Sequence, residues 1–148
     1  MDLIHYGSDC FDPEQFRPIA DDIEGSRIKP SGGLWTSPVG SEHGWKDWCE
    51  SEDFHTGRLR KSFTVRFTGR LFVIATQMDL YAIPESITPW GAWIPLWKKL
   101  MDRGFDAVHL TWEGQCATRH THPKSLRGWD CETVLVMNPK SIKPLVVA

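Results

Sequence analysis

Residues 130–139 read Asp-Cys-Glu-Thr-Val-Leu-Val-Met-Asn-Pro and have a strongly strand-like composition, which indicates where the sheet of this protein lies. Residues 131–137 are rich in β-branched and large apolar side chains, a composition typical of a buried strand. The Asn-Pro pair ends the strand, because proline cannot donate to a ladder of hydrogen bonds. Side chains alternate along a strand, so Glu132 is expected to share a face with Val134.

Two carboxylates stand at the start of this strand. A buried carboxylate costs free energy unless it is paired or used. Asp130 precedes Glu132 by two residues, so both are expected on one face. The pair is explained either by a salt bridge at the strand end or by catalysis, and the spacing alone leaves both explanations open.

Outward from this strand, the sequence predicts an α+β fold. Strands outnumber helices and do not alternate regularly with them, which favours α+β over a βαβ repeat. Residues 113–129 are polar and basic and show no hydrophobic periodicity, so no helix or strand is predicted there. The predicted strands are 3–6, 34–37, 61–68, 71–75, 106–111, 131–137 and one near 145–147, and the predicted helices are 42–51, capped by Ser41, and 89–103.

Length and charge bound the possible functions. The 148 residues suit one domain, expected to span 1–148, because no repeat or linker divides them. Seventeen basic against 19 acidic residues give a net charge of −2, which excludes a basic footprint over the whole chain. No apolar run approaches a membrane span, and four widely spaced cysteines predict free thiols. We therefore expect a cytoplasmic protein that has no signal peptide and no membrane partner.

Metal and thiol chemistry are weakly indicated. Cys116, His120 and His122 fall within seven residues, but zinc requires three or four ligands with tight pairs. Only the two histidines resemble a pair, so no metal is expected. A cysteine nucleophile with a histidine base is possible, although no family signature surrounds any thiol.

Four segments resemble the ADP-ribosyltransferase fold, in its diphtheria-toxin and poly(ADP-ribose) polymerase branch. His5-Tyr6-Gly7 resembles the opening His-x-Gly motif. Residues 33–37, Gly-Leu-Trp-Thr-Ser, followed by a helix that bears Trp45 and Trp48, resemble the aromatic strand and helix of that branch. The strand that carries Glu132 resembles the terminal glutamate strand, and Gly104-Phe105-Asp106-Ala107-Val108 resembles the strand before it. Tryptophans stand where the family usually has a tyrosine.

The resemblance implies split antiparallel β-sheets with a few short helices, and NAD as co-substrate. It implies that His5 holds a ribose hydroxyl, that aromatic side chains wall the nicotinamide, and that Glu132 is the main catalytic group, with Asp130 orienting the acceptor or taking its proton. Cleavage of the bond between nicotinamide and ribose builds positive charge on the ribose. A carboxylate held in a fixed position stabilises that charge. The expected donor-binding residues are His5, Tyr6, Gly7, Gly33, Trp35, Ser37, Trp45 and Trp48.

The resemblance also places a target-selecting loop before the catalytic glutamate. There Arg119, Lys124 and Arg127 are expected to bind an acidic protein surface or a nucleic acid. A solvated loop would explain the same charges. The overall pattern is similar to small proteins encoded by bacteriophages, which implies a macromolecular target in the host cytoplasm. The alternatives are a phage anti-defence inhibitor that binds a host protein or nucleotide without turnover, and a simple NAD hydrolase.

Overall fold

The computed structural model describes residues 1–22 and 28–146. Its strands are β1 (Asp2–Tyr6), β2 (Leu34–Pro38), β3 (Ser62–Phe67), β4 (Leu71–Ile74), β5 (Glu85–Ile87), β6 (Trp93–Pro95), β7 (Ala107–Leu110), β8 (Thr133–Val136) and β9 (Ile142–Pro144). Its helices are α1 (Trp45–Glu52), α2 (Trp97–Asp102) and α3 (Trp112–Thr118), with 3-10 turns η1 (Pro13–Gln15), η2 (Thr56–Arg60), η3 (Gln77–Ala82) and η4 (Pro139–Ser141). None of these helices has the length and apolar character to cross a bilayer.

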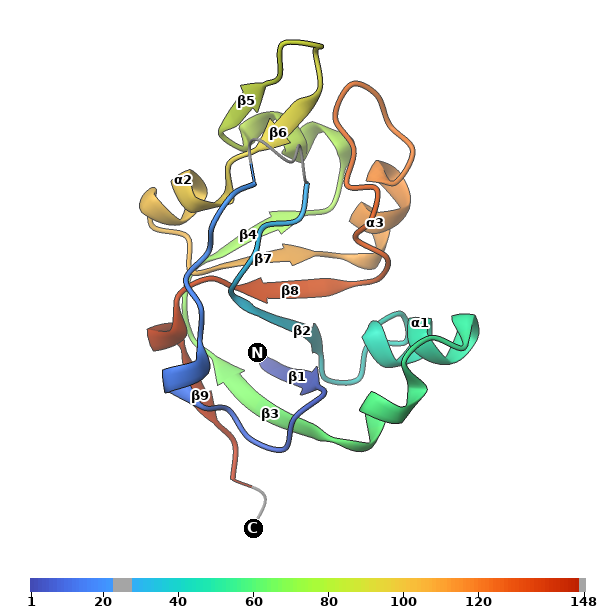
Figure 1. Cartoon of the computed structure of the whole chain (residues 1–148), viewed down its shortest axis with the longest axis vertical. Helices are drawn as coiled ribbons and strands as arrows, with labels where there is room; N and C mark the ends of the chain where they lie inside the picture. The colour runs from blue at the N-terminus through green and yellow to red at the C-terminus, as the bar shows by residue number, and fades with distance from the viewer. Residues whose placement is uncertain (23–27, 147–148) are drawn as a thin grey trace.

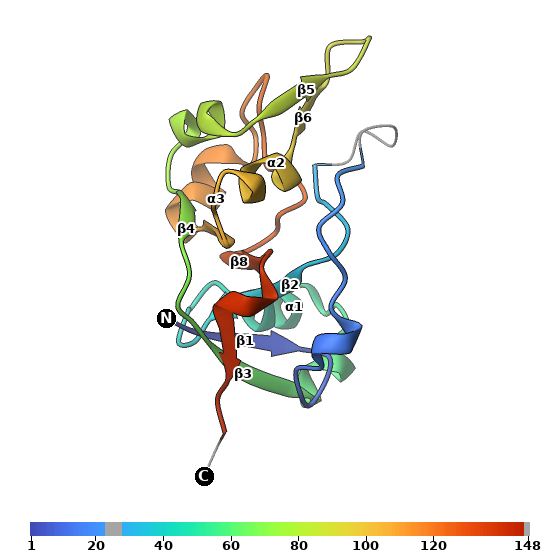
Figure 2. The same ribbon diagram turned by 90° about the vertical axis from the view of Figure 1, so that its left-hand side faces the viewer.

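One seven-stranded sheet organises the described residues, in the order β4-β7-β8-β2-β1-β3-β9. The pairing of β4 with β7 is parallel, and every other neighbouring pair in this sheet is antiparallel. Strands β5 and β6 form a separate hairpin, which lies at the opposite end of the molecule from β3 and β9 (Figures 1 and 2). The expected α+β class is confirmed.

Strand β2 joins the two halves of this sheet (Figure 1). Its first three residues pair with β8, whereas its last two, Ser37 and Pro38, pair with β1. The chain therefore passes from the β4-β7-β8 half to the β1-β3-β9 half within one strand. The end of β1 and the start of β8 come to lie on either side of this crossing.

Strand β8 separates two hydrophobic clusters. Leu135 packs with Trp97, Trp129 and other residues of the larger cluster, while Val134 and Val136 pack in the second cluster with β1 and β3 residues. The expected alternation is confirmed for residues 134–136, whereas the strand begins at Thr133 and does not include Glu132.

The predicted helix over 89–103 is wrong in its first half. Ser86 pairs with Ile94 and Ile87 with Trp93, so these apolar residues belong to the β5-β6 hairpin. Pro95 follows, and α2 begins only at Trp97. The apolar spacing that resembled a helix arises from a short strand followed by a short helix.

Two further expectations are corrected. Residues 113–129 contain α3, whose N-cap Thr111 accepts a hydrogen bond from Gly114 N through its hydroxyl. The last strand, expected near 145–147, is Ile142–Pro144, which pairs with β3, and residue 147 lies outside the described residues.

Gly114 provides a test of how closely α3 packs on the sheet. A Cβ at this position would lie 2.0 Å from the carbonyl oxygen of Ile74 in β4. We expect Gly114→Ala to lower the free energy of unfolding by about 2 kcal/mol, because backbone must move to relieve the overlap. Gly57→Ala is the control, since nothing lies within 4 Å of its added Cβ. Urea unfolding measures both, and equal stabilities would contradict this packing.

Candidate functional site

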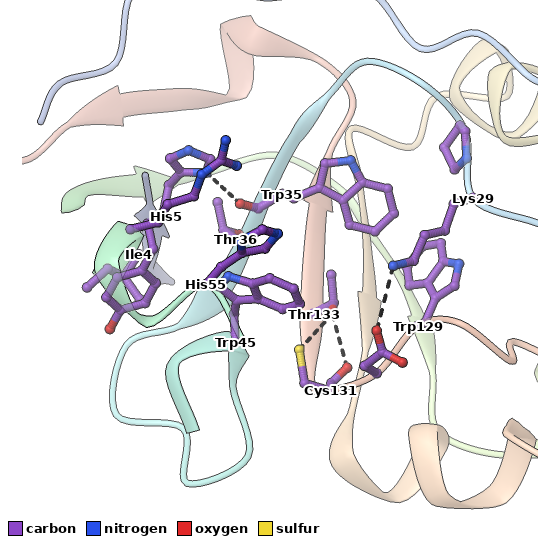
Figure 3. Close-up of a pocket in the computed structure, with 14 residues that line it drawn as sticks. Ile4, His5, Lys29, Trp35, Thr36, Trp45, His55, Trp129, Cys131 and Thr133 are labelled. Carbon is purple, nitrogen blue, oxygen red and sulfur yellow. Dashed lines mark hydrogen bonds and ion pairs between the residues drawn. The ribbon is translucent and has the colours of Figure 1, made fainter. Parts of the chain in front are cut away.

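A cavity of about 380 Å³, the central pocket, lies where β1, β2, α1 and the segment before β8 meet (Figure 3). Its walls come from segments that are far apart in the sequence. The lining residues are Ile4, His5, Tyr6, Lys29, Pro30, Trp35, Thr36, Trp45, His55, Arg58, Trp129, Asp130, Cys131 and Thr133. Five of the expected site residues, His5, Tyr6, Trp35, Trp45 and Asp130, are thus brought together.

His5 has a defined tautomer in its neutral form. Its Nδ1 lies 2.8 Å from the carbonyl oxygen of Trp35. A carbonyl oxygen only accepts hydrogen bonds, so Nδ1 must carry the proton. In the neutral ring, Nε2 then keeps a lone pair that can accept a hydrogen bond from a ligand hydroxyl.

Indole rings form much of the pocket wall. Trp35 and Trp129 meet edge to face, with centroids 5.0 Å apart and an interplanar angle of 64°. The ammonium group of Lys29 lies 5.5 Å from the Trp35 ring centroid. Such walls suit a flat ligand, particularly one that carries positive charge on its ring.

The tryptophans of α1 divide between two cavities. The Trp45 and Trp48 rings stack with centroids 5.2 Å apart and an interplanar angle of 18°. Trp45 lines the central pocket (Figure 3), whereas Trp48 lines a neighbouring groove. Of the two tryptophans of α1, only Trp45 therefore lines the central pocket.

Ser37 and Ser41 have different partners from those expected. Helix α1 begins at Trp45, whose N–H donates to Ser37 Oγ at 2.9 Å, while the N–H of Gly44 donates to Asp47. Ser37 is buried and holds the helix rather than lining the pocket. Ser41, the expected cap, instead donates its hydroxyl to Glu132.

Gly7 and Gly33 support the backbone and do not line the central pocket. Both have positive φ, and the N–H of Gly7 donates to the carbonyl of Lys61 at 2.9 Å. A Cβ on Gly33 would lie 2.7 Å from a methyl of Leu135, so this glycine permits close packing on β8.

Tyr6 does line the pocket. Burial, reinforced by nearby carboxylates, raises the pKa of its phenol, which therefore stays neutral near pH 7.

The two candidate carboxylates differ in their surroundings. Asp130 lines the central pocket and lies 4.0 Å from the Lys29 ammonium. Glu132 accepts the Ser41 hydroxyl at 2.6 Å and lies 2.8 Å from His109 Nε2. Glu132 is 17% exposed and is not among the residues that line the pocket, although its neighbours Cys131 and Thr133 are. The two acids therefore do not share partners.

A second cavity of about 530 Å³, the side groove, lies between α1 and α3. It shares Asp130 and Cys131 with the central pocket. Its lining residues are Glu42, His43, Asp47, Trp48, Ser51, Glu52, Trp112, Gln115, Arg119, His120, Arg127, Gly128, Asp130 and Cys131. Two of the expected target-binding residues, Arg119 and Arg127, are included.

Lys124 has a structural position instead. Its side chain is 9% exposed, its ammonium lies 3.0 Å from Glu85, and it stands 4.1 Å from the centroid of the Tyr81 ring. This charge ties the loop to η3 and the β5-β6 hairpin. Lys124 lines neither the central pocket nor the side groove.

The sequence did not indicate Lys29, His55, Arg58 or Trp129 as pocket residues. Lys29, His55 and Arg58 are basic residues in segments that show no hydrophobic periodicity, so no local pattern distinguishes them from other surface charges. For Trp129, its place beside Asp130 is a usable signal. In the described part of the chain, no three His, Cys, Asp or Glu residues are grouped so that they could hold a metal ion.

Comparisons with family models, curated proteins and solved structures found no match to this chain.

Thiol reactivity tests the burial of the pocket wall. Burial raises the pKa of the Cys131 thiol to about 11 and also raises that of Cys49. A raised pKa lowers the thiolate fraction, to about a thousandth for Cys131 at pH 8. We expect iodoacetamide at pH 8 to modify the exposed Cys10 and Cys116 at least about a hundredfold faster than Cys131. Mass spectrometry measures the rates, with urea-unfolded protein as control, and rapid labelling of Cys131 would contradict this burial.

Proposed function

We propose that the protein is an NAD-dependent mono-ADP-ribosyltransferase that modifies a host macromolecule in the bacterial cytoplasm during phage infection. The observation that carries the proposal is the central pocket. His5, Trp35 and Trp45 belong to the segments that resemble donor-binding motifs, and their side chains line the same cavity (Figure 3).

The pocket chemistry matches the donor. Nicotinamide in NAD is a flat cation, which indole faces attract by stacking and through their quadrupole. Nε2 of the neutral His5 ring is available to accept a hydrogen bond from a ribose hydroxyl. Lys29 and Arg58 supply positive charge for the diphosphate.

Glu132 is the proposed catalytic group, and Asp130 is the second acid. Both oxygens of Glu132 are held, one by Ser41 and one by His109, so its charge is fixed before any ligand arrives. Fixed charges stabilise a developing oxocarbenium ion without reorganisation. Because Glu132 lies outside the pocket lining, the proposal requires the donor ribose to reach the pocket rim at the start of β8.

The same position of Glu132 favours a second candidate function. Its carboxylate is already satisfied by two partners, and Asp130 is paired with Lys29. A pocket in which both acids serve structure would bind a nucleotide without turnover, as an inhibitor or anti-defence module would.

Labelled NAD separates these functions. Incubation of the protein with a bacterial lysate and NAD labelled in the adenosine part leaves the label on macromolecules if the protein is a transferase. A hydrolase leaves it on free ADP-ribose, and a binding module leaves it on intact NAD. Label recovered only on intact NAD, at saturating concentration, would refute the proposal.

Conservative amides test the two acids. We expect Glu132→Gln to lower the rate of nicotinamide release by roughly a hundredfold or more, with NAD affinity nearly unchanged, because shape is kept and charge is lost. Asp130→Asn, which also removes a charge, is the comparison, and Glu113→Gln on the exposed side of α3 is the control. A loss confined to Asp130→Asn would transfer the catalytic role to Asp130, and full activity in both variants would favour the binding module.

His5→Ala tests the ribose contact. Loss of one hydrogen bond costs about 0.5 to 1.5 kcal/mol, so we expect the dissociation constant for NAD to rise about two- to tenfold. His122→Ala is the control, because His122 is exposed and lines neither cavity. Calorimetry measures both, and equal affinities would limit His5 to its bond with Trp35.

A further inference from the structure

The side groove continues directly from the central pocket. Asp130 and Cys131 line both cavities. Helix α1 lines one side of the groove with Trp48 and Glu52, and α3 lines the other with Trp112 and Gln115. A molecule bound in the groove would therefore lie next to a ligand in the central pocket.

Negative charge dominates the groove, although the loop that borders it is basic in sequence. Four carboxylates line it, against the two guanidinium groups of Arg119 and Arg127. Arg119 is already engaged, since it bonds Gln115 and lies 5.7 Å from the centroid of the Trp112 ring. Glu42 and Glu52 are exposed. An excess of carboxylates attracts a cationic ligand and repels a polyanion.

Flat aromatic rings complete the groove. The His43 and Trp112 rings stack with centroids 4.0 Å apart and an interplanar angle of 10°. Trp48 lines the same groove from α1. Aromatic faces bordered by carboxylates suit a guanidinium or ammonium group, which gains from both the ring quadrupole and the opposite charge.

We propose that the side groove binds a polypeptide segment of the target through an arginine or lysine side chain. The inference rests on the function proposed above and narrows its macromolecular target to a protein. A nucleic acid would bring phosphates against the exposed Glu42 and Glu52, whereas a cationic side chain is attracted by both and has aromatic surface to contact.

Direct binding tests the groove without NAD. The probes are fluorescent Gly-Ser peptides that carry three arginines, three lysines or three glutamates, and an eight-nucleotide single-stranded RNA, measured by anisotropy at low and physiological salt. We expect both cationic peptides to bind, with affinity that falls as salt rises. Preferential binding of the glutamate peptide or the RNA would overturn the proposal.

Variants that remove a negative or a positive charge from the groove should change the affinity for the cationic peptides in opposite directions. Glu42→Gln combined with Glu52→Gln is expected to lower the affinity for the cationic peptides about fivefold, since each exposed carboxylate contributes modestly to binding. Arg127→Gln removes a charge that repels these peptides, so it is expected to raise their affinity about twofold. Glu113→Gln is the control on α3 outside the groove. Weaker binding in Arg127→Gln, or no change in the glutamate double variant, would overturn the proposal.

The two proposals fail in different ways. Peptide binding is measured without NAD, so absent NAD cleavage would refute the transferase and leave the groove result standing. Cleavage of NAD by a protein that binds neither cationic peptide would refute only the groove.

Discussion

Strand β8 is buried on both faces and hydrogen-bonded on both edges, to β2 and to β7. Val134, Leu135 and Val136 are fully buried, so the only polar side chain within this strand is that of Thr133 at its start. The polar residues of this part of the chain therefore gather just before it. This constraint places Asp130 and Glu132 where both halves of the sheet, α1 and α3 converge.

Much of the sheet could be predicted from sequence, because its strands follow local rules. Ser62–Phe67 alternates in hydrophobicity, and 131–137 is apolar enough to read as a buried strand. Helix α3 could not be predicted, because it buries polar residues. Gln115 is buried through a hydrogen bond from its amide nitrogen to the carbonyl of Trp129, and Thr118 through one to Gly114. Such burial depends on distant partners that no local pattern reveals.

The candidate site was predictable for the histidine and tryptophans of the central pocket and less so for its two acids. His5, Trp35 and Trp45 stood out through the order of their motifs, and the fold brings them together. The expectation that Asp130 and Glu132 face the same way assumed a strand, but β8 begins only at Thr133. Before that point Glu132 N donates to the carbonyl of His43, in the segment between β2 and α1, and alternation does not apply.

The bond between Ser37 and Trp45 has a consequence for ligand binding. Ser37 belongs to the strand that carries Trp35, and its hydroxyl fixes the first residue of the helix that carries Trp45. Two opposing aromatic surfaces are thus joined by a short buried link rather than by a long loop. The gap between them is preorganised, so a flat ring entering it has little protein conformational entropy to remove, and affinity depends mainly on how well the ring matches that gap.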